Sequence, residues 1–213
     1  MTDTSRERIL SRVRAAVDRA QDVPPPERDY LITHTSDDPI QNAELLQRNL
    51  SDYRAVVHRV TPTGLPGLIA ERLTAHRARS IVVPDAVPDS WLSACTIARH
   101  RDEGPLTPAL LDTVDAVLTG CALAIAETGT IVLDGGPDQG RRALTLVPDL
   151  HICVVRAPAQ IVSSVPQALP LLSPRAPLTW ISGPSATSDI ELDRVEGVHG
   201  PRRLEVILLG GVA

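Results

Sequence analysis

The 213-residue sequence contains no Phe and no Lys, and it has only two Trp and two Tyr. Without Lys it has neither a Schiff-base amine nor a phosphate-binding loop of the Walker type, because both require a lysine. The shortage of aromatic side chains excludes the stacking platforms that bind RNA or single-stranded DNA. A formal net charge of -5 provides no general attraction to nucleic acid or to an anionic membrane. The sequence therefore predicts no nucleic-acid partner.

Cysteine and long apolar runs are also scarce. Cys95, Cys121 and Cys153 are widely separated and form no C-x-x-C pair, and the six His form no H-x-x-x-H pair. We therefore expect this chain to bind no metal ion and no iron–sulfur cluster by itself. Reduced cysteines, no signal-peptide core and no apolar run of about 18 residues predict a cytoplasmic protein without a membrane span.

The composition is otherwise ordinary for a soluble globular protein, with 43% hydrophobic and 22% charged residues. Residues 4–20 place their apolar side chains on one stripe and predict an amphipathic, arginine-rich helix that docks on its own protein or on another subunit. Three prolines at 24–26 then predict a stiff linker. The expected organisation is an N-terminal helical extension with its linker over residues 1–50 and an α/β domain over residues 51–213.

Within that domain, helical and β-branched segments alternate, which is typical of β-α-β units with a parallel sheet. A run of short apolar segments separated by Gly and Pro, from 121 to 155, predicts three closely spaced strands and an antiparallel or mixed part of the sheet. The predicted helices cover residues 38–53, 65–76, 88–92, a short stretch from 107, 160–172 and a stretch from 185; the remaining predicted strands cover 55–60, 80–84, 116–118, 178–181 and 203–209.

Glu127 is the first candidate functional residue, because it lies between two short apolar runs, in Ala-Ile-Ala-Glu-Thr-Gly-Thr at 124–130. Thr128 and Gly129 complete a strand-to-strand turn in which Gly129 can adopt a positive φ. Glu127 could act as a base, as a nucleophile or as an acceptor for a ligand hydroxyl. It could equally accept backbone hydrogen bonds in a tight turn, and the spacing alone favours that structural role.

A glycine-rich loop with two arginines follows, in Asp134-Gly-Gly-Pro-Asp-Gln-Gly-Arg-Arg. The backbone amides at Gly135 and Gly136 and the guanidinium groups of Arg141 and Arg142 could hold a carboxylate or phosphate. A flexible hairpin with solvated arginines is an equally good interpretation of the same residues.

The third segment is a predicted strand–turn–helix at 178–191, in which Gly183 forms the turn and Ser185 begins the helix. Free amides at such a helix start, at the carboxyl edge of a sheet, form an anion site. The alternative is simple helix capping by the hydroxyl groups, and the two can coexist. The polar candidates for this site are Ser185, Thr187, Ser188 and Asp189.

Two histidines, His199 and His151, differ in their sequence surroundings. His199 lies between two glycines and could approach the same sheet edge, although a lone histidine is more often structural than catalytic. His151 lies inside an apolar run and is interpreted as a hydrogen-bonded core residue.

Taken together, these motifs resemble the LUD-domain family. The resemblance covers residues 55–210. The matching segments are 124–130, Gly135-Gly-Pro, 142–148 ahead of 151–155, Ile181-Ser-Gly-Pro-Ser-Ala-Thr-Ser-Asp-Ile-Glu191, and Gly197-Val-His-Gly-Pro-Arg202.

The resemblance implies a fold similar to the NagB/RpiA/CoA-transferase-like superfamily, an open three-layer α/β/α arrangement with a mixed sheet. It also implies a role in the bacterial oxidation of L-lactate to pyruvate, together with companion proteins that look like iron–sulfur oxidoreductase subunits. On this basis the iron–sulfur clusters would belong to the partners. The chain itself would be a subunit of an oxidoreductase complex that binds a small carboxylate or phosphate, rather than an independent catalyst.

Two alternatives remain open from the residues. The turn at 126–129 resembles the Ser-Glu-Asn-Gly turn of CoA-transferases, with Thr in place of the amide residue, which would make the chain an acyl- or CoA-transfer enzyme using Glu127. The chain could also be a small-molecule-binding protein without catalysis.

Overall fold

The fold was analysed in a computed structural model, which describes residues 4–18, 24–102, 104, 106–187, 195–196 and 200–210, with the backbone alone at 186–187 and 195–196. The chain divides into two compact units, Met1–Tyr30 and Leu31–Ala213. In the described part of the chain, no helix has both the length and the apolar character needed to cross a membrane.

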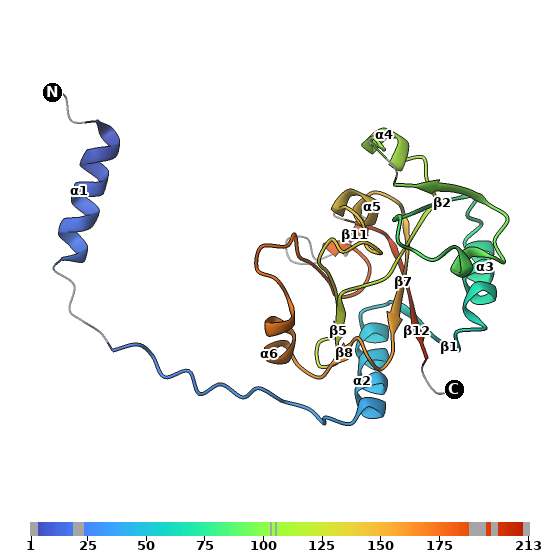
Figure 1. The fold of residues 1–213 in the computed structure, drawn as a ribbon, viewed down its shortest axis with the longest axis horizontal. Helices are drawn as coiled ribbons and strands as arrows, with labels where there is room; N and C mark the ends of the chain where they lie inside the picture. Colours follow the sequence, from blue (N-terminus) through green and yellow to red (C-terminus); the bar gives the residue numbers. More distant parts are fainter. Residues whose placement is uncertain are drawn as a thin grey trace. The chain divides into compact units, whose positions relative to one another are not determined.

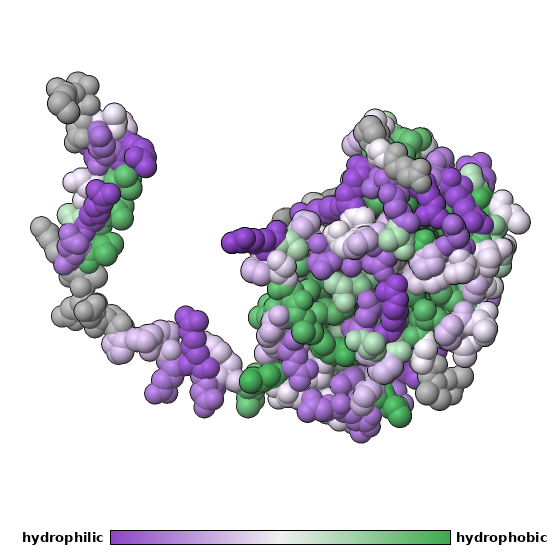
Figure 2. Space-filling view, in the orientation of Figure 1, coloured by the Kyte–Doolittle hydropathy of each residue, from purple (hydrophilic) through white to green (hydrophobic). Residues whose placement is uncertain are grey.

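Among the described residues of the first unit, Ser5–Val17 form helix α1. Thr4 caps it and exchanges hydrogen bonds with Glu7, a capping box that satisfies amide groups at the helix start. Figure 2 shows the apolar side chains of α1 gathered along one side of the helix. Ile9, Val13 and Val17 are exposed, so the predicted amphipathic helix forms, and it buries no residue of its own.

The second unit is built on a main sheet whose neighbouring strands all run parallel. The α/β class predicted from the sequence is confirmed. In the described residues this sheet has six strands, in the order β1 (Val56–Val60), β12 (Arg203–Leu209), β7 (Leu150–Arg156), β4 (Ala116–Thr119), β2 (Ser80–Val83) and β3 (Ala98–Arg101).

The antiparallel strands expected in the middle of the chain form a separate sheet. Its order among the described residues is β8 (Ile161–Val162), β5 (Leu123–Ile125), β6 (Thr130–Leu133) and β9 (Thr179–Ile181). β5 and β6 pair antiparallel as a hairpin, and β6 pairs antiparallel with β9. A two-stranded ladder of β10 (Ala186–Thr187) and β11 (Val195–Glu196) lies after β9 in the chain.

Helices and the second sheet cover the two faces of the main sheet (Figure 1). On one face, α3 and η1 pack their apolar residues against the alternate strand positions that include Ile81 and Ile152. On the other face, α2 and the second sheet pack against the positions that include Cys153 and Val206. The helices are α2 (Pro39–Asp52), α3 (Leu65–Ala75), η1 (Asp89–Leu92), α4 (Pro108–Leu111), α5 (Arg142–Leu146), α6 (Val165–Ala168) and η2 (Leu169–Leu171).

The division between the units differs from the predicted boundary at residue 50. Helix α2 was assigned to the extension, yet Leu46 and Leu50 are completely buried among residues of both sheets. Full burial of two leucines stabilises the fold by several kcal/mol, about 1.5–3 kcal/mol for each side chain. Helix α2 is therefore part of the α/β unit, and the extension ends near Tyr30.

The secondary-structure prediction is wrong in four places. The helix expected over 160–172 is replaced by β8, α6 and η2, because Pro166 and Pro170 allow helix starts but not a continuous helix. Strand β3 and the short helix α5 were missed. The helix expected from Ser185 is absent at residues 186–187, which form strand β10.

Candidate functional site

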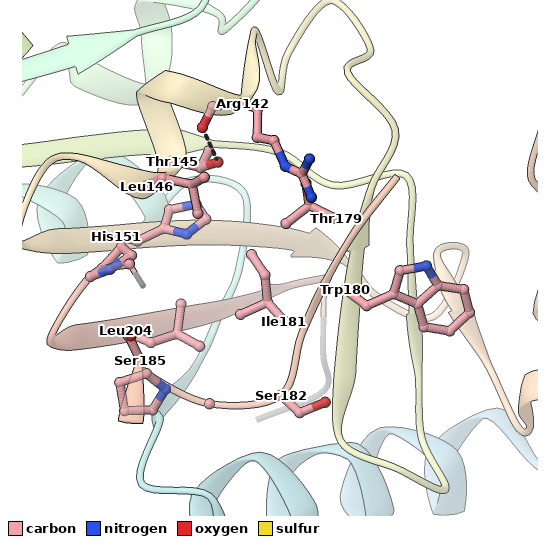
Figure 3. Close-up of a pocket in the computed structure, with 14 residues that line it drawn as sticks. Arg142, Thr145, Leu146, His151, Thr179, Trp180, Ile181, Ser182, Ser185 and Leu204 are labelled. Atoms are coloured by element: carbon pink, nitrogen blue, oxygen red, sulfur yellow. Dashed lines mark hydrogen bonds between the residues drawn. The ribbon is translucent and has the colours of Figure 1, made fainter. Parts of the chain in front are cut away.

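Three of the predicted ligand-binding residues, Arg142, Gly183 and Ser185, line one pocket of about 480 Å³, which we call the β9 pocket. It lies between β9 and the main sheet, where His151 and Leu204 stand near the amino ends of β7 and β12. Figure 3 shows Arg142 reaching toward it from α5, while the Trp180 indole points away. The lining residues are Arg142, Thr145, Leu146, His151, Thr179, Trp180, Ile181, Ser182, Gly183, Pro184, Ser185, Gly200, Pro201 and Leu204.

The charge of the described lining is positive only. Arg142 carries a full positive charge, and no carboxylate is among the described residues that line the pocket. The structure gives the Arg142 guanidinium no hydrogen bond or ion pair with any described residue. Thr145, Thr179 and Ser182 add hydroxyl groups to the same lining. A cation beside several hydroxyl groups, without a competing acid, is suited to a carboxylate or phosphate.

His151 gives the pocket a second kind of polar group. It is almost fully buried, and its Nε2 lies 2.8 Å from the Oγ1 of Thr119, which is itself buried. Burial lowers the pKa of His151 from 6.5 to about 4, because a charged imidazolium would lose its hydration. The ring is therefore neutral at pH 7. The sequence analysis interprets His151 as a hydrogen-bonded core residue, and the contact with Thr119 agrees with that interpretation. That view missed the pocket it borders.

A second pocket, of about 490 Å³, lies at the carboxyl ends of β2 and β3. We call it the loop pocket because the glycine-rich loop lines it, through Gly135, Gly136 and Arg141. It also contains two acids, Asp85 and Asp102, which repel an anion. The lining residues are Pro84, Asp85, Ala86, Asp102, Gly135, Gly136, Pro137, Gly140, Arg141, Arg142 and Pro177.

The two neighbouring arginines therefore have different environments. The Arg141 Nε lies 3.0 and 3.1 Å from the two carboxylate oxygens of Asp102, and its Nη2 donates to the carbonyl of Leu106. This guanidinium holds the loop to the end of β3, so its charge is largely used within the protein. Arg142 alone lines both pockets, and its guanidinium has no bonded partner among the described residues.

The glycine-rich loop folds back onto the carboxyl edge of the main sheet. Gly120, at the end of β4, donates its amide to the carbonyl of Asp138 at 2.8 Å, and Arg156 binds the Asp138 carboxylate at 3.0 Å. A Cβ atom at Gly120 would lie 2.2 Å from that carboxylate, so the approach requires glycine. In open parallel sheets ligands usually bind at this edge; here the chain's own loop occupies the end of β4.

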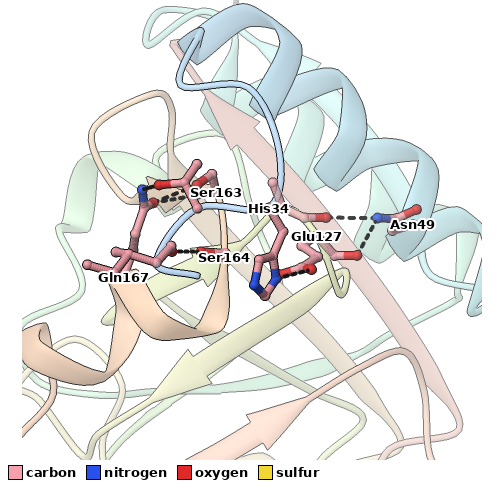
Figure 4. Close-up of polar contacts among 9 residues, drawn as sticks. His34, Asn49, Glu127, Ser163, Ser164 and Gln167 are labelled. Carbon is pink, nitrogen blue, oxygen red and sulfur yellow. Dashed lines mark hydrogen bonds and ion pairs between the residues drawn. The ribbon is translucent and has the colours of Figure 1, made fainter. Parts of the chain in front are cut away.

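Glu127 has its polar groups bound by neighbouring parts of the same unit (Figure 4). Its carboxylate lies 2.8 Å from Nδ1 of His34, and its amide donates to the carbonyl of Ser163. The Asn49 side chain donates to the carbonyls of both Ala126 and Glu127. These contacts tie the turn to α2 and to residues 32–37, which Ser164 and Gln167 also bind.

The Glu127 turn lies near the end of the strand that leads to Ser185, but it lines neither pocket. The turn with Glu127 lies at the end of β6 that adjoins the end of β9, where Thr130 and Ser182 hydroxyls are 2.8 Å apart. Glu127, Thr128 and Gly129 nevertheless line neither the β9 pocket nor the loop pocket. The glycine-rich loop follows the opposite end of β6, so the Glu127 turn and this loop lie at opposite ends of the strand.

The segment around Ser185 contributes to the pocket, but not as a helix start. The Ser185 amide donates to the carbonyl of Pro201 at 2.9 Å, so the amide expected to be free is already used. Gly183 has φ +85, and an added Cβ would lie 2.4 Å from the carbonyl oxygen of Tyr53. Both contacts direct the chain into β10, and the site lies at the amino ends of β7 and β12 instead of the predicted carboxyl edge.

The remaining predicted residues of that segment are not placed. Thr187 belongs to β10 by its backbone, and its side chain is not described. Ser188, Asp189 and His199 lie outside the described residues.

Another group that the sequence did not indicate surrounds Glu205 on β12. Its buried carboxylate lies 2.5 Å from Nε2 of His58 and 2.6 Å from Nε2 of His76. Burial opposes ionisation, but the hydrogen bonds from both rings prevail and lower the pKa of Glu205. Three residues distant in sequence meet there, so no local motif could have shown them. Within the described residues no cluster of His, Cys, Asp or Glu is arranged to hold a metal ion.

Comparison with known proteins gives the same family as the motifs. The family model described as the LUD domain matches residues 101–209. A protein of Deinococcus radiodurans called "Lactate utilization protein C" is 52% identical over 179 residues, 81% of this chain and 82% of its own length. A protein of the same name from an Exiguobacterium species is 28% identical and covers 98% of this chain and 97% of its own length.

A solved structure supports the fold as well. The crystal structure of a DUF162 family protein from Deinococcus radiodurans is similar with a TM-score of 0.71 and 43% sequence identity, and the match covers 82% of this chain and all of that one. The domain match and the relative at 52% identity agree. The chain therefore belongs to the LUD-domain family.

Proposed function

We propose that this chain is a component of a bacterial L-lactate utilisation system and that it binds a small carboxylate in the β9 pocket. The role in lactate utilisation is supported by the names of its relatives, including the one at 52% identity. The binding role is supported by one observation above all. Arg142 offers a guanidinium without a bonded partner among the described residues, in a pocket whose described lining contains no acid.

The redox centres of such a system would belong to partner subunits. An iron–sulfur cluster is usually held by four cysteine thiolates, whereas the three cysteines of this chain are far apart in sequence and buried as free thiols. We therefore infer that the chain acts with iron–sulfur oxidoreductase subunits in the oxidation of L-lactate to pyruvate. In that arrangement its contribution is to bind the substrate or product acid, or to join the complex, and not to transfer electrons itself.

The ligand-binding part can be tested on the purified protein by calorimetric titration with L-lactate, pyruvate and inorganic phosphate at low salt. We expect saturable binding of at least one of these anions and a loss of tenfold or more in Arg142→Gln, because a charged hydrogen bond is removed. Arg48→Gln is the matched control, since Arg48 is exposed on α2 and lines neither pocket. Equal affinities for wild type and Arg142→Gln would refute the assignment to this pocket.

The proposed association with iron–sulfur subunits has to be tested in the native organism. A tagged chain expressed from its own locus should co-purify with proteins that show the visible absorption of iron–sulfur clusters, and deletion of its gene should prevent growth on L-lactate. Complementation with Arg142→Gln should restore the complex but not full growth. Recovery of the chain alone, together with normal growth of the deletion strain on lactate, would exclude the proposed role.

A further inference from the structure

His151 is an unusual residue for its position. It lies in β7, a central strand whose neighbours Leu150 and Ile152 are buried apolar residues. A polar side chain is costly to bury unless its hydrogen bonds are satisfied, and an apolar residue would avoid that cost. Its ring borders the β9 pocket, in which Arg142 also lies. A buried neutral imidazole beside an exposed cation suggests that the pocket recognises more than a negative charge.

The contact with Thr119 indicates which ring nitrogen carries the proton. Thr119 is buried, and its hydroxyl has no hydrogen-bonding partner among the described residues other than Nε2 of His151. A buried hydroxyl proton needs an acceptor, so Thr119 donates to Nε2. In a neutral imidazole the other nitrogen then holds the proton, which makes Nδ1–H a donor.

That donor is available to a ligand. Nδ1 has no partner among the described residues. Among the described residues, two fully buried side-chain atoms lack a hydrogen-bond partner, Oγ1 of Thr35 and Nε of Arg72. Nδ1 of His151 is not one of them, so it is not fully enclosed by protein atoms. Since His151 lines the β9 pocket, Nδ1–H borders the space that a ligand would fill. The pocket thus offers a guanidinium for a carboxylate and, separately, one uncharged N–H donor for a second oxygen.

We propose that His151 determines the specificity of the β9 pocket for 2-hydroxy and 2-oxo acids, with the carboxylate bound by Arg142 and the 2-oxygen accepting a hydrogen bond from Nδ1–H. Thr119 is the positioning residue that holds the ring in this tautomer. The inference rests on the proposed function, because it requires that the pocket bind a carboxylate. It adds the class of acid and the residue that selects it.

The test compares acids that differ only in the 2-oxygen. L-lactate and pyruvate are titrated against propionate, and 2-oxo-4-methylpentanoate against 4-methylpentanoate, because the apolar lining near Leu146 and Leu204 can accommodate a longer chain. In the wild type we expect the oxygenated acid of each pair to bind about three- to tenfold more tightly, the effect of one neutral hydrogen bond. In His151→Leu this preference should vanish while the affinity for propionate stays unchanged.

The outcomes separate the two proposals. If acids bind and depend on Arg142, but the wild type shows no preference for the 2-oxygen, the specificity inference is overturned and the proposed function stands. If no carboxylate binds at all, both are overturned. A preference that persists undiminished in His151→Leu also overturns the inference, since another group must then provide the hydrogen bond.

A second variant guards against a folding defect in His151→Leu. Thr119→Val keeps the shape of the buried threonine and removes its hydroxyl, and circular dichroism and thermal unfolding report whether both variants fold. Nitrogen NMR of the wild type at pH 7 should show a neutral His151 protonated at Nδ1, and Thr119→Val should shift the tautomer and weaken the 2-oxygen preference. A wild-type ring protonated at Nε2, or charged at pH 7, would contradict the proposal.

Discussion

The Glu127 turn and the β9 pocket are both polar regions of the same unit, but their polar groups are used differently. At the turn, the Glu127 carboxylate binds His34, and the carbonyls of the turn accept from Asn49. At the pocket, Arg142 has no bonded partner among the described residues, and one nitrogen of His151 is likewise unbonded there. The conspicuous sequence motif is thus satisfied internally, whereas the pocket retains unused binding capacity.

This difference shows how a structural role and a binding role can be separated. A polar group whose partners all come from the protein holds the chain together, and its replacement changes stability. At neutral pH, a polar group kept beside a cavity without such partners contributes little to folding, and its replacement changes ligand binding. Variants at the two regions should therefore sort by which of these two quantities they change.

The largest effect on stability is expected in acid, through the pocket histidine His151. The pKa of His151 falls from 6.5 in the unfolded chain to about 4 in the folded one, so the unfolded state binds a proton first as the pH falls. Stability conferred by the neutral ring is present above pH 6.5 and is lost as the pH falls toward 4, by roughly 3 kcal/mol.

Urea denaturation at pH 7 and at pH 4.5, on the wild type and on His151→Gln, measures this loss. The variant has no group that titrates at this position, and it should lose correspondingly less stability in acid. The same loss in both proteins would show that His151 is not held neutral by burial.

The next largest effect on stability is expected at the turn itself. Gly129 has φ +59, and an added Cβ would lie 2.7 Å from the backbone carbon of Asn49. Gly129→Ala should therefore cost about 2 kcal/mol of unfolding free energy, from backbone strain and the clash with α2. Gly67→Ala is the matched control, because no described atom lies within 4 Å of its Cβ position in α3; it should be neutral or stabilise by up to about 1 kcal/mol. Equal effects would mean that the turn does not need glycine.

A smaller loss is expected when the amide that holds the turn is removed. The Asn49 Nδ2 lies 2.8 Å from the carbonyl of Ala126 and 2.9 Å from that of Glu127. Asn49→Ala leaves both acceptors without this donor and should cost about 1–2 kcal/mol in chemical denaturation. Carboxylate binding should stay unchanged, because Asn49 lines neither pocket. A large loss of binding would show that the two regions are coupled.

The smallest effect is expected for Glu127, the first candidate functional residue of the sequence analysis. His34 and Glu127 are 39% and 29% exposed in their side chains, and ion pairs of this kind contribute little, about 0–1 kcal/mol. Glu127→Gln should therefore change the unfolding free energy by less than about 1 kcal/mol and leave the affinity for carboxylates as in the wild type. A strong loss of lactate utilisation in cells that carry this variant would restore Glu127 as a functional residue.

Much of the fold was predictable because local patterns specify it. The helix starts at Asp38 and Thr107 carry capping side chains that accept backbone hydrogen bonds, and the buried strands β2, β4 and β7 are mostly apolar. The prediction failed where chain topology decides. The antiparallel strands form their own sheet, and residues after Ser185 pair as a strand, because distant partners such as Tyr53 and Pro201 fix the backbone there.

The candidate site could be predicted only in part, because local motifs indicate its residues whereas contacts distant in sequence determine their surroundings. Arg142, Gly183 and Ser185, each predicted from the sequence as a candidate for anion binding, line one pocket. The different roles of Arg141 and Arg142 could not be predicted, because they depend on whether Asp102 reaches one guanidinium or the other. His151 could not be assigned to the pocket either, since an apolar strand context is compatible with a buried core residue and with the floor of a cavity.

The sequence by itself determined the α/β class, most elements and the family resemblance, because hydrophobic periodicity, glycine and proline positions and ordered motifs are local properties. The tertiary structure alone decided which polar groups are satisfied and which face a cavity. Hydrogen bonds such as that between His34 and Glu127, or between Thr119 and His151, join residues 93 and 32 positions apart. Their formation depends on packing across the whole unit, and that packing leaves Arg142 available to a ligand.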